Sequence, residues 1–177
     1  MNEFLTYEYV AAPPKNKKLR ALLIAVYALY ALVPLLIVST VGKLFLPLYA
    51  LVPLTLCIIA WLTWPITSPE YEYSMTSGVL TFSVIQGGRR RKKQFEITVK
   101  DMAVIAPYSK MYRDKIDEYA PEKIYDGTSS LEAENAYFAL FENENGEKCV
   151  YYFEATERAL KILRHYNPKT VVTPVKF

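Results

Sequence analysis

The sequence of 177 residues has few of the side chains that catalysis and metal binding usually require. It contains one histidine, His165, and two widely separated cysteines, Cys57 and Cys149, which do not have the spacing of a zinc site or a disulfide framework. We interpret the cysteines as small apolar side chains and His165 as a residue near a helix end. The residues therefore predict no catalytic constellation, no metal site and no cofactor, and a non-enzymatic protein is expected.

Charge is almost absent between Ala21 and Trp64, where Lys43 is the one charged residue. Two apolar runs of about 23 residues, 19–41 and 44–66, flank a turn expected at Gly42 and Lys43. A helix of that length rises roughly 35 Å, which is enough to cross the hydrocarbon core of a bilayer. The sequence thus predicts two transmembrane helices. A cleaved signal peptide fits poorly because a second apolar run follows almost at once.

The two runs also lack Asp, Glu and His. Proton relays and ion pathways inside membranes depend on such residues, so a transporter or channel is not predicted. Pro34, Pro47 and Pro53 lie within the runs and are expected to kink the helices or create packing sites.

Basic residues near the runs predict their orientation. Lys15, Lys17, Lys18 and Arg20 precede the first run, whereas Lys43 alone lies between the two. The positive-inside rule then places residues 1–18 in the cytoplasm as a basic N-terminus. Two crossings return the chain, so residues 67–177 are expected to form a cytoplasmic domain of a multi-pass plasma-membrane protein.

Beyond Pro65 the apolar residues alternate with polar ones, as in strands. Strands are predicted over 71–76, 80–84, 95–99, 136–141 and 149–153, with a hairpin at Asn145-Gly146. Residues 109–135 are interpreted as an excursion that interrupts the sheet and contains a short helix over 111–119. A last amphipathic helix is predicted between the cap Thr156 and the stop Asn167-Pro168.

This order carries a family resemblance. The segment YEYSMTSGVLTFSVIQGGRRRKKQFEITVKDMAVIA (residues 71–106), the Asn-Gly hairpin and the closing Tyr-Asn-Pro-Lys resemble small bacterial two-span membrane proteins of unknown function. Those proteins carry a cytoplasmic pleckstrin-homology-like (PH-like) domain. The resemblance implies an α+β fold in which a transmembrane helical hairpin precedes an antiparallel PH-like β-barrel or sheet with a C-terminal helix. It implies no catalytic residue.

The most distinctive polar feature is a basic run at residues 89–93, which consists of Arg89, Arg90, Arg91, Lys92 and Lys93. We expect it in a turn or at a strand start. One interpretation is a solvated loop that discourages edge aggregation. Another is contact with anionic headgroups of the inner leaflet, worth about 1 kcal/mol per basic residue. Contact with an acidic partner is a third. The net charge of +3 is too small to indicate nucleic acid binding.

These observations predict a membrane-anchored adaptor or scaffold whose domain binds anionic lipid, a protein partner, or both. The expected partners are the bilayer, anionic headgroups, and another membrane protein or a second copy. The tyrosine-rich excursion, with Tyr108, Tyr112, Tyr119 and Tyr125, is a candidate protein-binding face. A structural subunit of a larger membrane assembly is the alternative, and a membrane-associated enzyme is a remote one.

Overall fold

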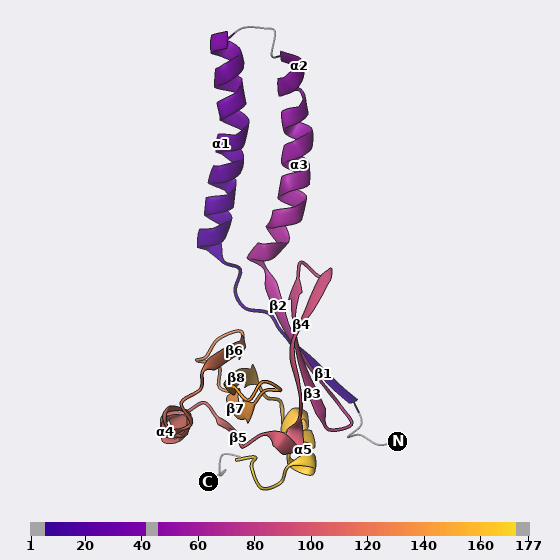
Figure 1. Cartoon of the computed structure of the whole chain (residues 1–177), viewed down its shortest axis with the longest axis vertical. Coiled ribbons are helices and arrows are strands. Elements are labelled where there is room, and N and C mark those ends of the chain that lie inside the picture. The colour runs from indigo at the N-terminus through magenta and orange to yellow at the C-terminus, as the bar shows by residue number, and fades with distance from the viewer. Residues whose placement is uncertain (1–5, 42–45, 173–177) are drawn as a thin grey trace. The chain divides into compact units, whose positions relative to one another are not determined.

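The computed structural model describes residues 6–41 and 46–172. Contacts divide the chain into two compact units (Figure 1). The first, called the helical unit, comprises Pro14–Pro69 together with Gln86–Gly88. The second, called the β unit, comprises Glu70–Ile85, the chain from Arg89 onward, and the residues that precede Pro14. The β unit is therefore built from both sides of the helical segment.

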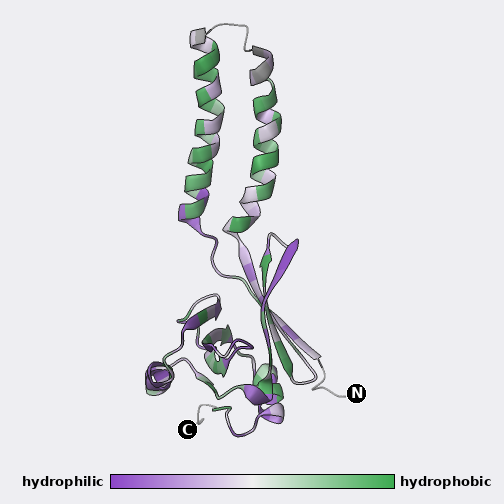
Figure 2. Cartoon of the chain, viewed as in Figure 1, coloured by the Kyte–Doolittle hydropathy of each residue, from purple (hydrophilic) through white to green (hydrophobic). Residues whose placement is uncertain are grey.

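The helical unit consists of α1 (Lys17–Val41), α2 (Leu46–Tyr49), α3 (Leu51–Thr63) and a 3-10 turn, η2 (Trp64–Thr67). Figure 1 shows α1 running beside α2 and α3 as a hairpin, and Figure 2 shows the apolar character of α1 and α3. By length and composition, one helix in the described chain can cross a membrane, Lys17–Thr40, and none of its most apolar window is buried. The turn expected at Gly42 and Lys43 lies outside the described residues.

The second predicted span, 44–66, is not one continuous α-helix. The helix is interrupted at Ala50, and the segment ends as the 3-10 turn η2. Pro53 lies three residues beyond the interruption and has no N–H to donate to the carbonyl of Tyr49, so one turn of the helical hydrogen-bond ladder is missing there. Pro34, in contrast, lies inside a continuous α1.

Two hydrogen bonds join the helices. The hydroxyls of Tyr27 and Thr63 are 2.5 Å apart, and those of Tyr30 and Thr55 are 2.8 Å apart. Each threonine hydroxyl also donates to a carbonyl in its own helix, four residues earlier. The two tyrosines are therefore the donors between the helices. All four hydroxyls have a hydrogen-bond partner in a region that contains few other polar groups.

The β unit contains two four-stranded sheets. The first has the order β1-β2-β3-β4, from the strands β1 (Thr6–Ala11), β2 (Pro69–Thr76), β3 (Val79–Gln86) and β4 (Arg90–Thr98). The turn at Ser77 and Gly78 has positive φ at both residues, the conformation of a tight hairpin. The three strands predicted after Pro65 are thus confirmed, and β4 begins earlier than expected.

The second sheet has the order β5-β7-β8-β6. Its strands are β5 (Val104–Pro107), β6 (Lys123–Gly127), β7 (Ala136–Glu142) and β8 (Lys148–Glu154). A short 3-10 turn, η3 (Val99–Asp101), joins the two sheets. β7 and β8 form the hairpin predicted at Asn145-Gly146, and β6 pairs with β8 in parallel.

Two expectations are corrected by this sheet. Residues 109–135 do not simply interrupt the sheet, because they contribute the helix α4 (Lys110–Tyr119) and the edge strand β6. Nor is the sheet wholly antiparallel. The helix α4 lies between β5 and β6 in sequence and reverses the chain direction, so β6 returns parallel to β8. Propensity alone did not reveal β6, whose side chains are mostly exposed.

The cores explain why β7 and β8 are apolar at nearly every position. Alternate residues of both strands, such as Phe141 and Tyr151, pack with Tyr73 and Phe82 of the first sheet and with the C-terminal helix α5 (Glu157–Tyr166). The other face packs against α4 through a second cluster that contains Ala106, Ile116, Phe138, Leu140 and Val150. Covering both faces of a sheet removes the usual alternation of polar residues.

The N-terminal segment 1–18, in which no strand was predicted, contains one. Thr6–Ala11 forms β1 and pairs antiparallel with β2, from Thr6 opposite Thr76 to Ala11 opposite Tyr71. The sequence TYEYVA alternates in the same way as the YEYSM of β2, which is the signal that could have indicated a strand. The segments that precede and follow the helices therefore lie side by side in one sheet.

Candidate functional site

The tip of the β3–β4 hairpin belongs to the helical unit. Gly87 and Gly88 have φ of +59° and +66°, which few residues other than glycine adopt. A Cβ on Gly87 would overlap the ring of Pro65 in η2, whereas a Cβ on Gly88 would meet no atom within 4 Å. The chain thus contacts the end of the returning helix closely at Gly87, and the basic run begins two residues later.

The structure assigns different surroundings to the five basic residues. Arg89 lies in the turn, and the other four form the first half of β4 rather than a loop. Arg91 donates to Glu72 at 2.5 Å and lies 3.9 Å from Glu8. Lys93 pairs with Glu96 at 3.2 Å.

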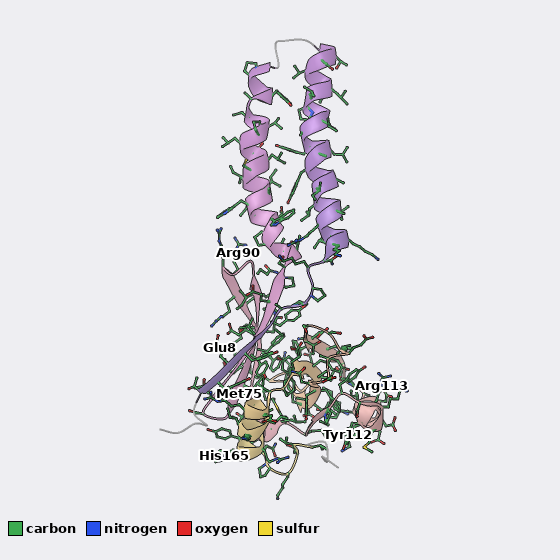
Figure 3. All side chains as sticks on the ribbon, turned by 180° about the vertical axis from the view of Figure 1, so that it is seen from behind. Glu8, Met75, Arg90, Tyr112, Arg113 and His165 are labelled. Atoms are coloured by element: carbon green, nitrogen blue, oxygen red, sulfur yellow. The ribbon has the colours of Figure 1, made fainter. Side chains whose placement is uncertain are left out.

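Arg90 and Lys92 are exposed, and they have no ion pair within the described chain (Figure 3 labels Arg90). They alternate with Arg91 along the strand, so their side chains leave the strand on the same side as each other. Arg90 and Lys92 are therefore the members of the run best placed to bind an external anion.

Arg91 has a structural partner. The Glu72 side chain is 4% exposed, and burial raises the pKa of this carboxyl against the opposing effect of Arg91. Glu8 of β1, labelled in Figure 3, adds a second carboxylate beside the same guanidinium. Arg91 therefore joins β1, β2 and β4 and compensates a buried charge, a role that its neighbours in the run do not share.

Of the four basic residues predicted to determine topology, three are exposed and one is hydrogen-bonded within the helical unit. Lys15, Lys17 and Lys18 are exposed. The guanidinium of Arg20 donates to the hydroxyls of Thr67 at 3.2 Å and Ser68 at 2.8 Å, and it lies 5.3 Å from the ring centroid of Trp64. The start of α1 and the end of the returning helix are thus joined through Arg20.

Backbone contacts strengthen this junction. The N–H of Asn16 donates to the carbonyl of Thr67, and the Asn16 side chain accepts from the N–H of Leu19, as a helix cap does. Thr67 is fully buried. The helical hairpin therefore begins and ends at one hydrogen-bonded base.

A polar cluster in the β unit anchors β1. The Glu154 carboxylate accepts from the Tyr9 hydroxyl at 2.8 Å and from the Ser129 N–H at 2.6 Å. Burial alone would raise the pKa of Glu154, but these hydrogen bonds hold it below its usual range. Burial and the neighbouring Glu154 raise the pKa of Tyr9 to about 12. Tyr7 adds a hydroxyl contact of 2.6 Å to Thr156, the cap of α5.

The tyrosines of the expected excursion pack largely against the domain. Tyr108, Tyr112 and Tyr119 lie against the second core cluster, and Tyr125 lies against the first. Figure 3 labels Tyr112 and Arg113 on α4. These side chains thus contribute to folding, and the proposed protein-binding face cannot consist of fully exposed tyrosines.

The remaining reactive residues do not converge. His165 lies in the last turn of α5 with its ring 5.1 Å from that of Tyr166, Cys149 is buried in the core, and Cys57 is exposed on α3. Within the described residues, no group of three or more His, Cys, Asp or Glu side chains is arranged to hold a metal ion.

Two sheets followed by a C-terminal helix define a PH-like domain, a class that is generally non-enzymatic and associated with binding of lipids or proteins. The sequence matches the family described as "Bacterial PH-like domain (DUF6106)" over residues 7–173, and the chain belongs to this family. The match includes β1 except its first residue, the helices α1, α2 and α3, and the rest of the two sheets. Comparisons with curated proteins and with solved structures find no match.

Proposed function

We propose that the protein is a membrane-anchored, non-enzymatic adaptor whose PH-like domain contacts anionic lipid through the basic run. The proposal includes two crossings, by α1 and by the α2–α3–η2 segment, with residues 1–18 and 67–177 in the cytoplasm. The observation that carries it is the contact of Gly87 with Pro65, because it ties the residues next to the basic run to the end of the returning helix.

The pairing of β1 with β2 supports the two crossings. A single crossing would place residues 6–11 and 69–76 on opposite sides of the bilayer, where they could not share a sheet. The segment from α2 to η2 is shorter than α1 but has no charged residue in its α-helical part, and the Arg20 junction brings its end back to the start of α1. Leu22, Leu29, Leu36 and Trp61 are each 60% or more exposed, which supports a lipid surrounding for both helices.

Electrostatics supports the lipid contact. Basic residues near an anionic leaflet contribute about 1 kcal/mol each, and the helices hold the domain near the bilayer at high effective concentration. We assign the lipid contact to Arg89, Arg90 and Lys92, which are exposed in the turn and at the start of β4; Arg91 and Lys93 pair with carboxylates of the domain. Their combined contribution is at most about 3 kcal/mol, or roughly 100-fold in affinity.

Native mass spectrometry of the full chain in detergent tests this assignment. The chain is titrated with short-chain phosphatidylglycerol or phosphatidylcholine, beside the triple variant Arg89→Gln, Arg90→Gln, Lys92→Gln. The matched control is a second triple variant, which removes three exposed cations elsewhere: Lys110→Gln, Lys161→Gln, Lys169→Gln. We expect the triple variant alone to lose phosphatidylglycerol adducts. Equal adducts in the wild type and the triple variant would refute the lipid contact.

The alternative, a structural subunit of a larger membrane assembly, is favoured by one observation. An apolar groove of about 360 Å³ lies between the helices and is lined by Tyr30, Pro34, Ile37, Val38, Tyr49, Leu51, Val52 and Thr55. A side chain of a neighbouring helix could occupy such a groove. Co-purification of other membrane proteins with the full chain, lost on Pro34→Leu, would support this alternative.

A further inference from the structure

A second cleft lies in the β unit, between the edge strands of the two sheets. It has a volume of about 270 Å³ and is lined by β4, β6 and the β7–β8 hairpin. Four consecutive β4 residues, Lys93, Gln94, Phe95 and Glu96, line it. Consecutive side chains of a strand point to opposite faces, so a cleft lined by all four runs along the edge of β4 rather than over one face.

Three aromatic side chains lie beneath the cleft, and Tyr125 is the most exposed of them. The ring centroid of Phe95 lies 4.8 Å from that of Tyr125 and 4.8 Å from that of Phe141. The polar residues around them balance in charge and are Lys93, Gln94, Glu96, Lys123, Asn143, Glu144 and Asn145. Such a cleft can take one apolar side chain of a ligand against Tyr125 and hydrogen-bond its surroundings.

The β4 edge is available for strand addition. β4 is the last strand of its sheet and β6 is the last of the other, so within the described residues each has a neighbouring strand on one side only. An extended segment beside such an edge gains main-chain hydrogen bonds along its length. β4 has nine residues, close to the upper end of the usual range, so its edge is long enough for an added strand.

Charge indicates which segment fits. Arg90 and Lys92 continue the edge beyond the cleft. Full-length antiparallel pairing of two β4 strands would place Arg90 opposite Thr98 and Lys92 opposite Glu96, so a second copy would supply one carboxylate for the two cations. Protection against self-association explains the cations, but it does not explain an aromatic cleft beside them. Carboxylates of a partner are complementary to both residues.

We propose that the β4 edge binds an extended acidic segment of a partner protein as an added strand. One apolar side chain of the segment enters the cleft over Phe95 and Tyr125, and carboxylates lie beside Arg90 and Lys92. The cleft does not take part in the proposed lipid contact. The two proposals can therefore fail separately, although they share Arg90 and Lys92.

Fluorescence anisotropy tests the proposal with the full chain in zwitterionic nanodiscs, which offer no anionic lipid. The probe is a labelled nine-residue peptide of alternating glutamate and valine with a central phenylalanine. Three comparison peptides are used: one with lysine for glutamate, one with alanine for phenylalanine, and one with alternate backbone nitrogens methylated. Methylation removes the N–H donors that strand addition needs without changing the charge.

We expect the probe to bind, and each comparison peptide to bind at least about tenfold more weakly. The pair Arg90→Glu, Lys92→Glu and the cleft-filling Asn145→Trp should each weaken binding, whereas Lys110→Glu, Lys161→Glu should not. Hydrogen exchange on the bound wild type should slow in β4.

No binding, or equal binding of the methylated peptide, would overturn strand addition. If Asn145→Trp binds the probe as tightly as the wild type does, the role of the cleft is overturned, and charge attraction is the one remaining source of binding. Because no anionic lipid is present, none of these results bears on the lipid contact, and loss of phosphatidylglycerol adducts in the separate titration does not depend on the peptide.

Discussion

Gly87 lies in a turn where a side chain has neither the conformation nor the room it needs. Its φ of +59° disfavours any residue with a Cβ, and that Cβ would overlap Pro65. The left-handed conformation costs about 1–2 kcal/mol for an L-residue, and overpacking adds about 1–3 kcal/mol. Gly88 has a similar φ, +66°, but open space around it. Comparing substitutions at the two glycines therefore separates the cost of the left-handed conformation from the cost of overpacking.

We therefore expect Gly87→Ala to lower the free energy of unfolding by about 2–5 kcal/mol, and Gly88→Ala by about 1–2 kcal/mol. Chemical denaturation of the full chain in detergent, followed by circular dichroism, measures both. Gly87→Ala should also reduce phosphatidylglycerol adducts if the turn positions the basic run. Equal destabilisation by the two substitutions would show that the contact with Pro65 carries no free energy.

The basic run itself could be predicted as a candidate site because five adjacent cations are evident in any sequence. Which of the five pair with carboxylates of the domain could not be predicted in full. Arg91 meets Glu72 and Glu8, which lie 19 and 83 positions away and are brought to it only by the sheet. Lys93 meets Glu96, a local pair that spacing could have indicated. Which cations remain for a ligand is therefore a property of the folded sheet.

At the scale of elements, β1 depends on the polar cluster around Glu154. The Tyr9 hydroxyl donates to a charged acceptor, whereas the Tyr7 hydroxyl contacts the neutral Thr156. Hydrogen bonds to charged groups contribute about 1.5–3 kcal/mol and neutral ones about 0.5–1.5 kcal/mol. We expect Tyr9→Phe to destabilise the protein more than Tyr7→Phe, each measured by the same denaturation assay. Equal losses would contradict a charged acceptor.

The pH dependence of stability supplies a second readout for Tyr9→Phe. The pKa of Tyr9 is raised from 10.0 to about 12 in the folded protein, so the unfolded chain releases this proton first as pH rises. Its contribution is complete below pH 10 and is lost as pH rises to about 12, and Tyr9→Phe should flatten this decline. The lowered pKa of Glu154 acts oppositely, since its contribution is present above its ordinary value of 4.5 and is lost as pH falls through its lower folded value.

The elements with strong local signals were predicted well. Helix α5 follows its cap Thr156, whose hydroxyl accepts from the N–H of Ala159 as expected, and the hairpins at Ser77-Gly78 and Asn145-Gly146 lie where the turn residues indicate them. β1 and β6 were missed for different reasons. The partner of β1 lies beyond the whole helical segment, and the side chains of β6 are mostly exposed and contain little apolar pattern.

For the whole molecule, the pairing of β1 with β2 makes topology testable. We expect both ends of the chain to lie on the same, cytoplasmic side, because residues 6–11 and 69–76 share one sheet. Green fluorescent protein and alkaline phosphatase fusions at each end measure this, since the first is fluorescent only inside the cell and the second is active only outside. Fluorescence at both ends is expected, and opposite sides for the two ends would contradict the sheet.

Local patterns in the sequence were enough to indicate an apolar segment separate from a β-rich domain, most strands of that domain, its last helix and the family to which the chain belongs. These features follow from local hydropathy, alternation and turn chemistry, which act over a few residues. Those patterns did not indicate that the N-terminal segment completes the first sheet, that Gly87 contacts Pro65, or that β4 and β6 border one cleft. These contacts join residues that are distant in sequence, and long-range packing, rather than local propensity, selects them.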